Sequence, residues 1–451
     1  MRNFAWSVIA LLFVHSLLFS SLQPTTTEPD NLVAKAKEFV LLLEQGEFTK
    51  AVKLFDDVMS KAMSSEQLKK AWQSLTTQAG AFKKQTTVRK QISGKYDIVF
   101  ITCQFEKTLL DIKVVFDKNK QIAGLWFVPT QSSLKYSPPS YVNPSLFQEK
   151  EVKVGSGEYI LPGTLTLPEG DGPFQAVVLV HGSGPLDRDE SIGPNKPFRD
   201  LAWGLASKGI AVLRYEKRTK AYGKKLISDK KQLTVKEETI DDALAACQML
   251  RNTERIDVHQ IFVLGHSLGG MLIPRIAALD SKITGFIIMA GATRPLEDVI
   301  LEQLHYIFSI DGQISGSEKE KLAEIKAAVD KIKNLKTSEA EVSEENILGA
   351  PPVYWLDLHG YNPAQAAKNI KQPLLILQGG RDYQVTREDF NNWKKALSAR
   401  KNVTFKFYPQ LNHLFMAGKG KITPAEYNRA GHISKAVIED IAHWIKMAAK
   451  K

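Results

Sequence analysis

The sequence predicts an α/β protein in which a doubly wound, mostly parallel sheet follows a small α+β domain. Three observations predict this arrangement. From about Gln148 onward, short apolar runs alternate with helical patterns, as expected for parallel strands that are buried on both faces. Residues 30–130 contain helical patterns followed by alternating, β-branched segments. Residues 293–368 contain no strand pattern, which predicts a helical cap inserted into the sheet domain.

The composition is that of an ordinary globular protein. Hydrophobic residues make up 43% and charged residues 24% of the 451 residues, which excludes a disordered or collagen-like chain. A net charge of +11 is compatible with an anionic partner, but the lysines are scattered and no nucleic-acid-binding motif is present. We therefore expect a solvated basic surface and no nucleic-acid partner, while the oligomeric state stays open.

The N-terminus has the pattern of a secretory signal. Arg2 precedes an apolar stretch over residues 4–19, which small and polar residues follow. This pattern predicts a signal peptide over residues 1–22, cleaved near Ser20 or Ser21, and a secreted or periplasmic protein. An uncleaved anchor is the alternative. No other run is long and apolar enough to span a bilayer, so we expect no stable membrane insertion after cleavage.

Two cysteines, Cys103 and Cys247, are too few for a disulfide framework. Cys103 lies in a strand pattern and Cys247 in a helical pattern, so we expect both to be buried free thiols. The clustered Cys and His spacing of a zinc site is absent, and the sequence implies neither a metal nor an organic cofactor.

The first domain, residues 30–130, contains no recognisable catalytic constellation, and Glu106 and Asp111 are expected to be solvated. It resembles a small domain of unknown function found ahead of bacterial hydrolases, which is similar to the nuclear-transport-factor-2 fold. We therefore expect a non-catalytic role. The periodicities predict helices that start near Leu32, at 51–59 and at 65–78, followed by strands at 96–105, 108–116 and 122–127.

Residues 131–147 form a predicted linker, because they are rich in Ser, Pro, Tyr and Asn. The second domain then covers residues 148–451. Its predicted strands are 176–180, 210–213, 261–264, 283–289, 374–377 and 403–407, with helices at 237–250, 317–336 and 433–448.

The sharpest motif in the chain is Gly-His-Ser-Leu-Gly at 265–269. It follows the predicted strand 261–264 and precedes a helical pattern, which is the context of a nucleophile elbow. Gly265 and Gly269 provide the small residues that so tight a turn needs, and Ser267 is the predicted nucleophile. A chance Gly-rich turn is the alternative interpretation.

A serine hydroxyl needs a base to act as a nucleophile. In folds with such an elbow, an acid and then a histidine follow the serine along the chain, which excludes earlier histidines such as His266. His413 is the predicted base, because it follows the strand 403–407 at the edge where active-site loops lie. His432 is the alternative, although it precedes a helix and is expected to help that helix start.

The acid is expected in the loop after the preceding strand, 374–377. Asp382 lies there and is predicted to orient and stabilise the imidazole of His413. Glu388 and Asp389 are alternatives in the same segment.

The developing oxyanion needs two hydrogen-bond donors. The backbone N–H of Leu268, which follows the nucleophile, is one predicted donor. The second is expected in the Gly-rich loop after the strand 176–180. We favour the N–H of Ser183, with Gly182 as the alternative.

The elbow, Asp382, His413 and the His-Gly-Ser-Gly loop together resemble the α/β-hydrolase superfamily. The runs at 184–190, 194–200, 214–218 and 354–357 resemble, more particularly, bacterial two-domain esterases of the EstD type. These are grouped with serine aminopeptidase-like and acyl-CoA-thioesterase-like hydrolases. The resemblance covers nearly all of the mature chain and implies a carboxylesterase that acts on small acyl esters. A thioesterase, a peptidase and a binding protein on a hydrolase scaffold stay open.

A charged cluster is expected beside the oxyanion loop. Arg188 and Arg218, with Asp187 and Asp189, would either bind a polar substrate group or fix the loop. Gly182 is also a candidate for substrate contact. Trp355 and Tyr361 would line the acyl pocket or pack in the core.

Overall fold

The computed structural model describes residues 31–93, 96–130, 136–228, 233–336 and 346–448. The chain divides into two compact units. The predicted signal peptide lies outside the described residues, so its cleavage and the location of the protein stay predictions. No helix within the described ranges has both the length and the apolarity to cross a bilayer.

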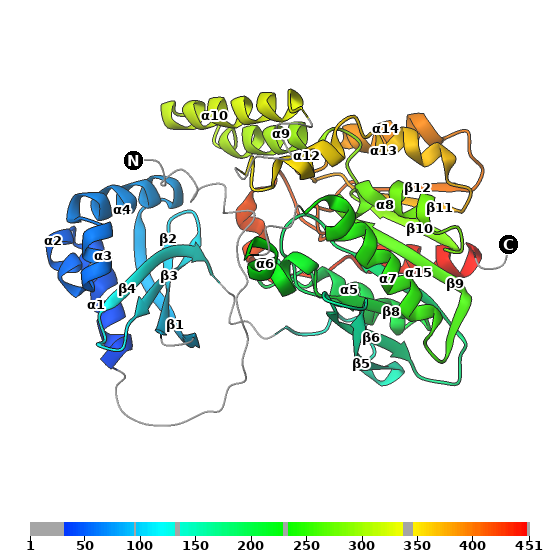
Figure 1. Ribbon diagram of the computed structural model, residues 1–451, viewed down its shortest axis with the longest axis horizontal. Coiled ribbons are helices and arrows are strands. Elements are labelled where there is room, and N and C mark those ends of the chain that lie inside the picture. The colour runs from blue at the N-terminus through cyan, green and yellow to red at the C-terminus, as the bar shows by residue number, and fades with distance from the viewer. Residues whose placement is uncertain (1–30, 94–95, 131–135, 229–232, 337–345, 449–451) are drawn as a thin grey trace. The chain divides into compact units, whose positions relative to one another are not determined.

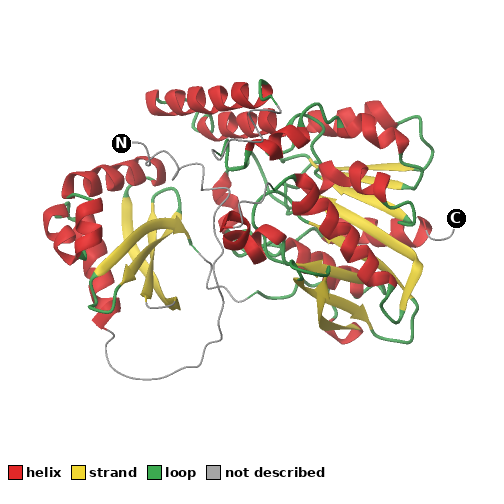
Figure 2. Ribbon diagram, viewed as in Figure 1, coloured by secondary structure: helices red, strands yellow, loops and turns green. Residues whose placement is uncertain are grey.

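The first unit is an antiparallel sheet with helices on one face (Figure 2). The predicted strands are confirmed. The sheet also has a further strand, β1, which was not predicted because its sequence is largely polar. The predicted helix 51–59 is broken at Phe55, after which Asp56 caps a new helix by accepting from Met59 N–H. The helices are α1 (Asn31–Glu44), α2 (Phe48–Ala51), α3 (Asp57–Ala62) and α4 (Ser65–Ala79), and the strands, in sheet order, are β1 (Phe82–Ser93), β2 (Tyr96–Phe105), β3 (Leu109–Phe116) and β4 (Ile122–Pro129).

One expectation for this unit is wrong. Glu106 is exposed as expected, but Asp111 is only 1% exposed. Asp111 lies on the sheet face opposite the helices, where it accepts a hydrogen bond from Thr102 Oγ1 at 2.7 Å and pairs with Arg89 at 3.3 Å. Cross-strand neighbours, which the sequence does not display, therefore bury this carboxylate. Cys103 and Cys247 are both buried free thiols, as predicted.

The second unit contains an eight-stranded sheet with helices on both faces, which confirms the predicted α/β-hydrolase architecture (Figure 1). All six predicted strands are present as neighbouring parallel strands. The sequence missed β5 and β6, which add an antiparallel edge to the sheet. In sheet order the strands are β12 (Val403–Tyr408), β11 (Leu374–Gly379), β10 (Gly285–Met289), β9 (Ile256–His266), β7 (Phe174–Val180), β8 (Ala211–Tyr215), β6 (Leu161–Pro168) and β5 (Phe147–Val154).

Alternate side chains of the parallel strands supply two separate cores. Val178 and Val263 pack on one face of the sheet with α7 and α8, while Val177 and Leu264 pack on the other with α5 and α15. Burial on both faces explains the continuous apolar runs of these strands. The helices are α5 (Pro197–Ala206), α6 (Arg218–Ser228), α7 (Asp241–Arg251), α8 (Leu268–Leu279), α14 (Arg387–Leu397) and α15 (Lys435–Ala448).

The insertion between β10 and β11 is helical, as predicted. Its described part contains α9 (Leu296–Phe308), α10 (Gly316–Lys333), α12 (Pro352–Leu358) and α13 (Pro363–Ala366). Ser315 and Glu318 form a capping box that starts α10. Within the described residues 293–336 and 346–368, there is no strand.

The described half of the predicted linker belongs to the second unit. The Tyr136 hydroxyl donates to Asp200 at 2.6 Å, and the Tyr141 hydroxyl donates to the carbonyl of Ile433 at 2.9 Å. Both tyrosines therefore anchor the chain before β5 begins.

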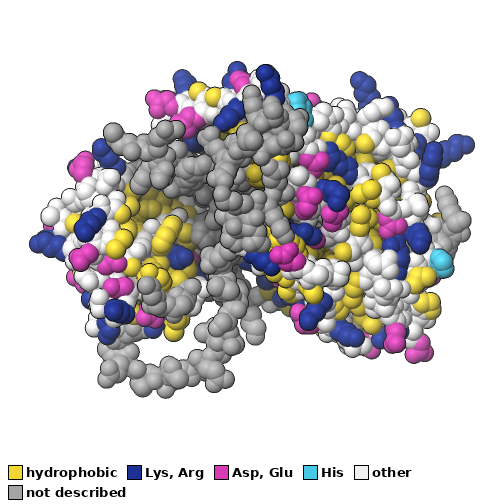
Figure 3. Space-filling view, viewed as in Figure 1, with side chains coloured by type: hydrophobic (Ala, Val, Ile, Leu, Met, Phe, Trp, Pro, Cys, Tyr) yellow, Lys and Arg dark blue, Asp and Glu magenta, His cyan; other side chains and the backbone are white. Residues whose placement is uncertain are grey.

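Charge is mixed on the visible surface. On the face shown in Figure 3, Lys and Arg side chains lie among Asp and Glu side chains in each unit. This distribution agrees with the expectation that the lysines are scattered.

Candidate active site

The elbow around Ser267 is a strained turn between β9 and α8. Ser267 has φ 53° and ψ −115°, an unfavourable conformation for a residue with a side chain. The backbone packs so closely that a Cβ at Gly265 would lie 2.3 Å from the carbonyl oxygen of Gly269. A Cβ at Gly269 would lie 2.4 Å from the carbonyl oxygen of Val180. Both glycines are therefore required by contact, as the motif predicts.

The structure brings the predicted acid and base together. His413 Nδ1 lies 2.7 Å from Asp382 Oδ2, and both side chains are buried. Asp382 Oδ1 accepts the backbone N–H groups of Gln384 and Val385, at 2.8 and 3.0 Å. Gln378 Nε2 donates to Oδ2 at 3.2 Å. Because all of these donors point at the carboxylate, the loop fixes its position.

The alternative residues have other partners. His432 Nδ1 lies 3.0 Å from Asp200 Oδ1. Asp389 is fully buried and accepts hydrogen bonds from Thr293 and Arg294, and Glu388 pairs with the same Arg294. His413 and Asp382 therefore fit the predicted roles best.

Ser267 and His413 lie on loops that touch. His266 Nε2 is 3.0 Å from the carbonyl oxygen of His413, and the two rings are 4.7 Å apart. Within the described residues, Ser267 Oγ makes no hydrogen bond to His413. Such contacts are often long before substrate binds.

The oxyanion loop lies against the nucleophile. A Cβ at Gly182 would be 3.1 Å from the Cβ of Ser267. The Gly182 N–H donates to Glu190 Oε1 at 2.7 Å, so this alternative donor is already engaged. In the described part of the chain, the Ser183 N–H has no acceptor. Leu268 is the first residue of α8, where backbone N–H groups lack a partner within the helix.

Glu190 and His266 form a buried pair behind the elbow that the sequence did not predict. His266 Nδ1 lies 2.9 Å from Glu190 Oε2. Burial would lower the pKa of His266, but the Glu190 carboxylate outweighs it and raises this pKa above its ordinary value. Burial would raise the pKa of Glu190, but the charge of His266 holds it below its ordinary value. The two residues are 76 positions apart in the printed sequence, so no local pattern signals the pair.

His181, in the same loop, behaves differently. Burial lowers the pKa of His181 to about 4, so its imidazole is neutral near pH 7. His181 Nε2 lies 3.0 Å from the carbonyl oxygen of Asp187, and the ring packs against Phe198 and Tyr215. It therefore supports the loop as a neutral side chain.

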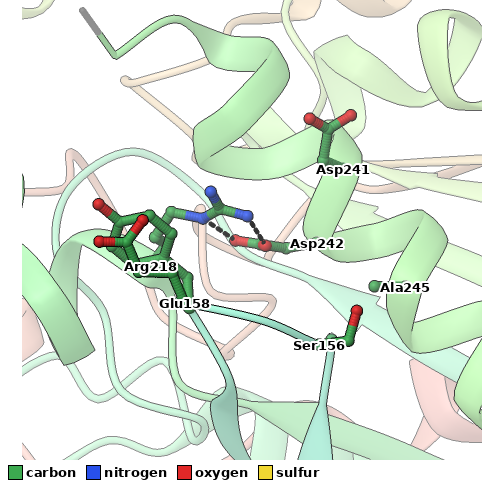
Figure 4. Close-up of a pocket in the computed structure, with 8 residues that line it drawn as sticks. Ser156, Glu158, Arg218, Asp241, Asp242 and Ala245 are labelled. Carbon is green, nitrogen blue, oxygen red and sulfur yellow. Dashed lines mark hydrogen bonds and ion pairs between the residues drawn. The ribbon is translucent and has the colours of Figure 1, made fainter. Parts of the chain in front are cut away.

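The candidate substrate-binding arginines have structural partners. Arg188 donates to Glu151 at 2.6 Å and to Glu216 at 2.9 Å, which ties the oxyanion loop to the edge of the sheet. Arg218 pairs with Asp242, as Figure 4 shows, and both residues line a cavity of about 260 Å³. Within the described chain, neither arginine hydrogen-bonds to a residue of the predicted triad.

The other polar and aromatic candidates also have partners. Asp189 forms ion pairs with Arg214, Lys196 and Arg199. Trp355 is buried and donates to the carbonyl of Ile347 at 2.7 Å. The Tyr361 hydroxyl donates to the carbonyl of Met271 at 3.0 Å. These contacts match the structural interpretations of the cluster and of the aromatic residues, and whether any of them contacts substrate stays a prediction.

The cap is attached to the loop that carries Asp382. Tyr306 of α9 stacks on Tyr383, with ring centroids 4.9 Å apart, and Gln303 Nε2 donates to the carbonyl of Gln384 at 3.0 Å. The residues next to the predicted acid therefore also hold the insertion.

The arrangement suits acyl transfer. It places a strained serine, a buried acid–base pair and a free backbone donor around one edge of the sheet. Among the described residues, no three His, Cys, Asp or Glu side chains converge as metal ligands.

Comparison with known proteins matches both units. Residues 172–419 match a family described as serine aminopeptidase, S33, and residues 36–125 match a family of unknown function. Over 407 residues the chain is 42% identical to esterase EstD from Thermotoga maritima, covering 90% of this chain and 93% of that protein.

Solved structures with lower similarity include two esterases. Est1E from Butyrivibrio proteoclasticus is 15% identical with a TM-score of 0.42, covering 67% of this chain and 99% of that chain. An esterase from Pyrococcus furiosus is 14% identical with a TM-score of 0.43, covering 71% and 96%.

Proposed function

Because the chain belongs to the S33 serine aminopeptidase family of hydrolases, we propose that it cleaves small acyl esters through a covalent acyl-enzyme on Ser267. The 42% identity to esterase EstD over 90% of the chain supports a carboxylic ester hydrolase. The observation that carries the mechanism is the 2.7 Å contact between His413 and Asp382, at the edge of the sheet where the strained Ser267 lies.

In the proposed first step, Ser267 Oγ attacks the ester carbonyl while His413 Nε2 takes its proton. Asp382, which is hydrogen-bonded to Nδ1, keeps the ring in the tautomer that leaves Nε2 free to accept the proton. The carbonyl oxygen becomes an oxyanion between the N–H groups of Ser183 and Leu268. Collapse of this intermediate expels the alcohol, which takes the proton from His413, and leaves the acyl group on Ser267.

In the proposed second step, water replaces the alcohol. His413 removes a proton from the water, whose oxygen attacks the acyl carbonyl through a second tetrahedral intermediate. The carboxylic acid then leaves, and the proton returns to Ser267.

A peptidase is the second candidate, because the matched family is described by an aminopeptidase activity. A thioesterase would use the same residues. Substrate comparison separates these activities, while a binding protein would lack all of them.

The test is hydrolysis of a p-nitrophenyl ester series, with fluorophosphonate labelling in parallel. We expect the wild type to be active and labelled, and Ser267→Ala to lose label and at least about 10⁴-fold in kcat. Ser317→Ala, at an exposed serine on α10, is the matched control and should behave like the wild type. Label that persists in Ser267→Ala would mean that another serine is the nucleophile. An inert wild type would favour the peptidase or binding-protein alternatives.

We also propose that the N-terminal segment directs the protein out of the cytoplasm and that the first unit is not required for ester hydrolysis. Removal of residues 1–135 tests the second point, because this cut keeps Tyr136 and Tyr141 with the unit that they anchor. Retained kcat on p-nitrophenyl esters is expected. N-terminal sequencing of the exported protein tests the first point.

A further inference from the structure

We propose that Lys217 is a positioning residue that points the Ser183 N–H into the oxyanion site by holding the carbonyl oxygen of Gly182. This inference rests on the proposed function, since it concerns how that reaction's intermediate is stabilised. Lys217 lies in the run 214–218, but no sequence motif assigns it a role.

Lys217 lies directly behind the oxyanion loop. Its side chain is 2% exposed, and Nζ donates to the carbonyl oxygen of Gly182 at 2.8 Å. Its backbone N–H donates to the carbonyl of Leu186, in the same loop, at 3.1 Å. A buried ammonium costs several kcal/mol unless it is well bonded, so the position of this charge is tightly defined.

Because the peptide bond is planar, the contact at the Gly182 oxygen also fixes the direction of the Ser183 N–H. Gly182 and Ser183 share one trans peptide, in which the C=O of Gly182 and the N–H of Ser183 point in opposite directions. When Lys217 holds the oxygen on one side, the N–H must project from the other. The ammonium also polarises this peptide, which strengthens the N–H as a donor.

The peptide before Gly182 is held as well. Its N–H donates to Glu190 Oε1 at 2.7 Å, so two buried charged side chains fix the backbone on either side of this glycine. Of the N–H groups of Gly182 and Ser183, the Ser183 N–H alone has no acceptor in the described chain. It is therefore the group that remains available to an oxyanion.

A purely structural role is the competing explanation. Lys217 also pairs with Glu238 at 3.2 Å, and Glu238 accepts from the hydroxyls of Tyr354 and Thr219. The ion pair alone could justify a buried lysine, so the experiment has to remove the Gly182 contact without leaving an unpaired buried charge.

The double variant Lys217→Met/Glu238→Gln does this, because it removes both charges and keeps similar side-chain volumes. Glu238→Gln alone is the matched control, since it breaks the ion pair but keeps the lysine on Gly182. Wild type and both variants are compared in fluorophosphonate labelling of Ser267, in kcat and KM, and in affinity for a trifluoromethyl ketone that forms a tetrahedral adduct. Thermal unfolding and the ¹⁵N–¹H shift of Ser183 in the ketone complex are followed in parallel.

We expect the double variant to lose about 10- to 100-fold in kcat and a similar factor in ketone affinity, with KM changed by less than about threefold. The Ser183 amide shift on ketone binding should shrink, and Glu238→Gln should stay within about threefold of the wild type in kcat. Equal losses in both variants, or kcat and ketone affinity retained in the double variant, would overturn the inference while Ser267 still takes the label. A wild type that takes no label would overturn the proposed function, and this inference with it.

Discussion

The elbow and the oxyanion loop lie against each other, yet different forces hold them. Around Ser267 the backbone is fixed by contact between main-chain atoms, with Gly269 packed under the carbonyl of Val180. Around Ser183 the backbone is fixed by buried charges, because Glu190 and Lys217 bond to the two sides of Gly182. The contact in the elbow leaves no room for a side chain at Gly265 or Gly269, whereas the position of Gly182 depends on two charged side chains.

This difference explains which loop the sequence reveals. Steric exclusion leaves small residues at fixed spacing, so the elbow is visible as a motif. Buried charges from Glu190, Lys217 and Glu238 are spread over 49 positions of the printed sequence and leave no local pattern.

Asp382→Asn should give the largest loss. The amide would keep the shape of the loop but would present an N–H₂ group or a weaker acceptor to His413, which disturbs the ring tautomer. We expect kcat to fall about 10⁴-fold, near 5.5 kcal/mol, with little change in the thermal midpoint. Steady-state kinetics with p-nitrophenyl esters measure this. A loss below about tenfold would show that Asp382 is not the partner of the base.

Gly269→Ala tests the claim that close contact between main-chain atoms is required in the elbow. Its Cβ would lie 2.4 Å from the carbonyl oxygen of Val180, so β7 or α8 must shift. We expect a loss of about 4 kcal/mol or more in the free energy of unfolding, or no soluble protein. Gly316→Ala is the matched control, because nothing lies within 4 Å of its Cβ position. Urea titration of both variants decides, and similar stabilities would contradict the steric explanation.

Acid should destabilise the oxyanion loop through His181. The pKa of His181 is lowered to about 4 by burial, against about 6.5 in an unfolded chain. The unfolded chain therefore binds an extra proton below pH 6.5, and stability falls as the pH drops from about 6.5 to about 4. The expected loss is about 3 kcal/mol over this range.

His181→Asn isolates this effect. The pKa of His266 is raised, so its contribution has the opposite sign and is lost as the pH rises. Urea midpoints for wild type and His181→Asn at pH 7 and pH 4.5 give the difference. If both proteins lose equal stability on acidification, His181 does not titrate as described.

The smallest effect is expected for Arg188→Gln. Arg188 pairs with the exposed Glu151 and the partly buried Glu216, which supports a role in fixing the loop. We expect a loss of about 1 kcal/mol in stability and KM for neutral esters within about twofold of the wild type. A KM that rises tenfold with unchanged stability would instead restore the substrate-binding interpretation.

The sequence predicts most of the parallel sheet and the residues expected to react. Ser267, Asp382 and His413 each follow a predicted parallel strand, so position along the chain implies position at one edge of the sheet. Strands β1 and β5 were not predicted, because lysines and other polar residues give them little apolar pattern. The buried contacts of Asp111 and His266 were not predicted, because their partners are distant in the chain. Tertiary contacts therefore decide the burial of these two residues.

The attachment of α9 has a consequence for protein engineering. Tyr306 stacks on Tyr383, and Gln303 donates a hydrogen bond to the carbonyl of Gln384. Both contacts are made immediately after the predicted acid. The cap is therefore not a free accessory that can be exchanged between homologous enzymes at its two chain ends alone. When the cap is exchanged, residues 382–385 should be exchanged together with it. Otherwise the altered contacts between the cap and this loop would displace the carboxylate that faces His413.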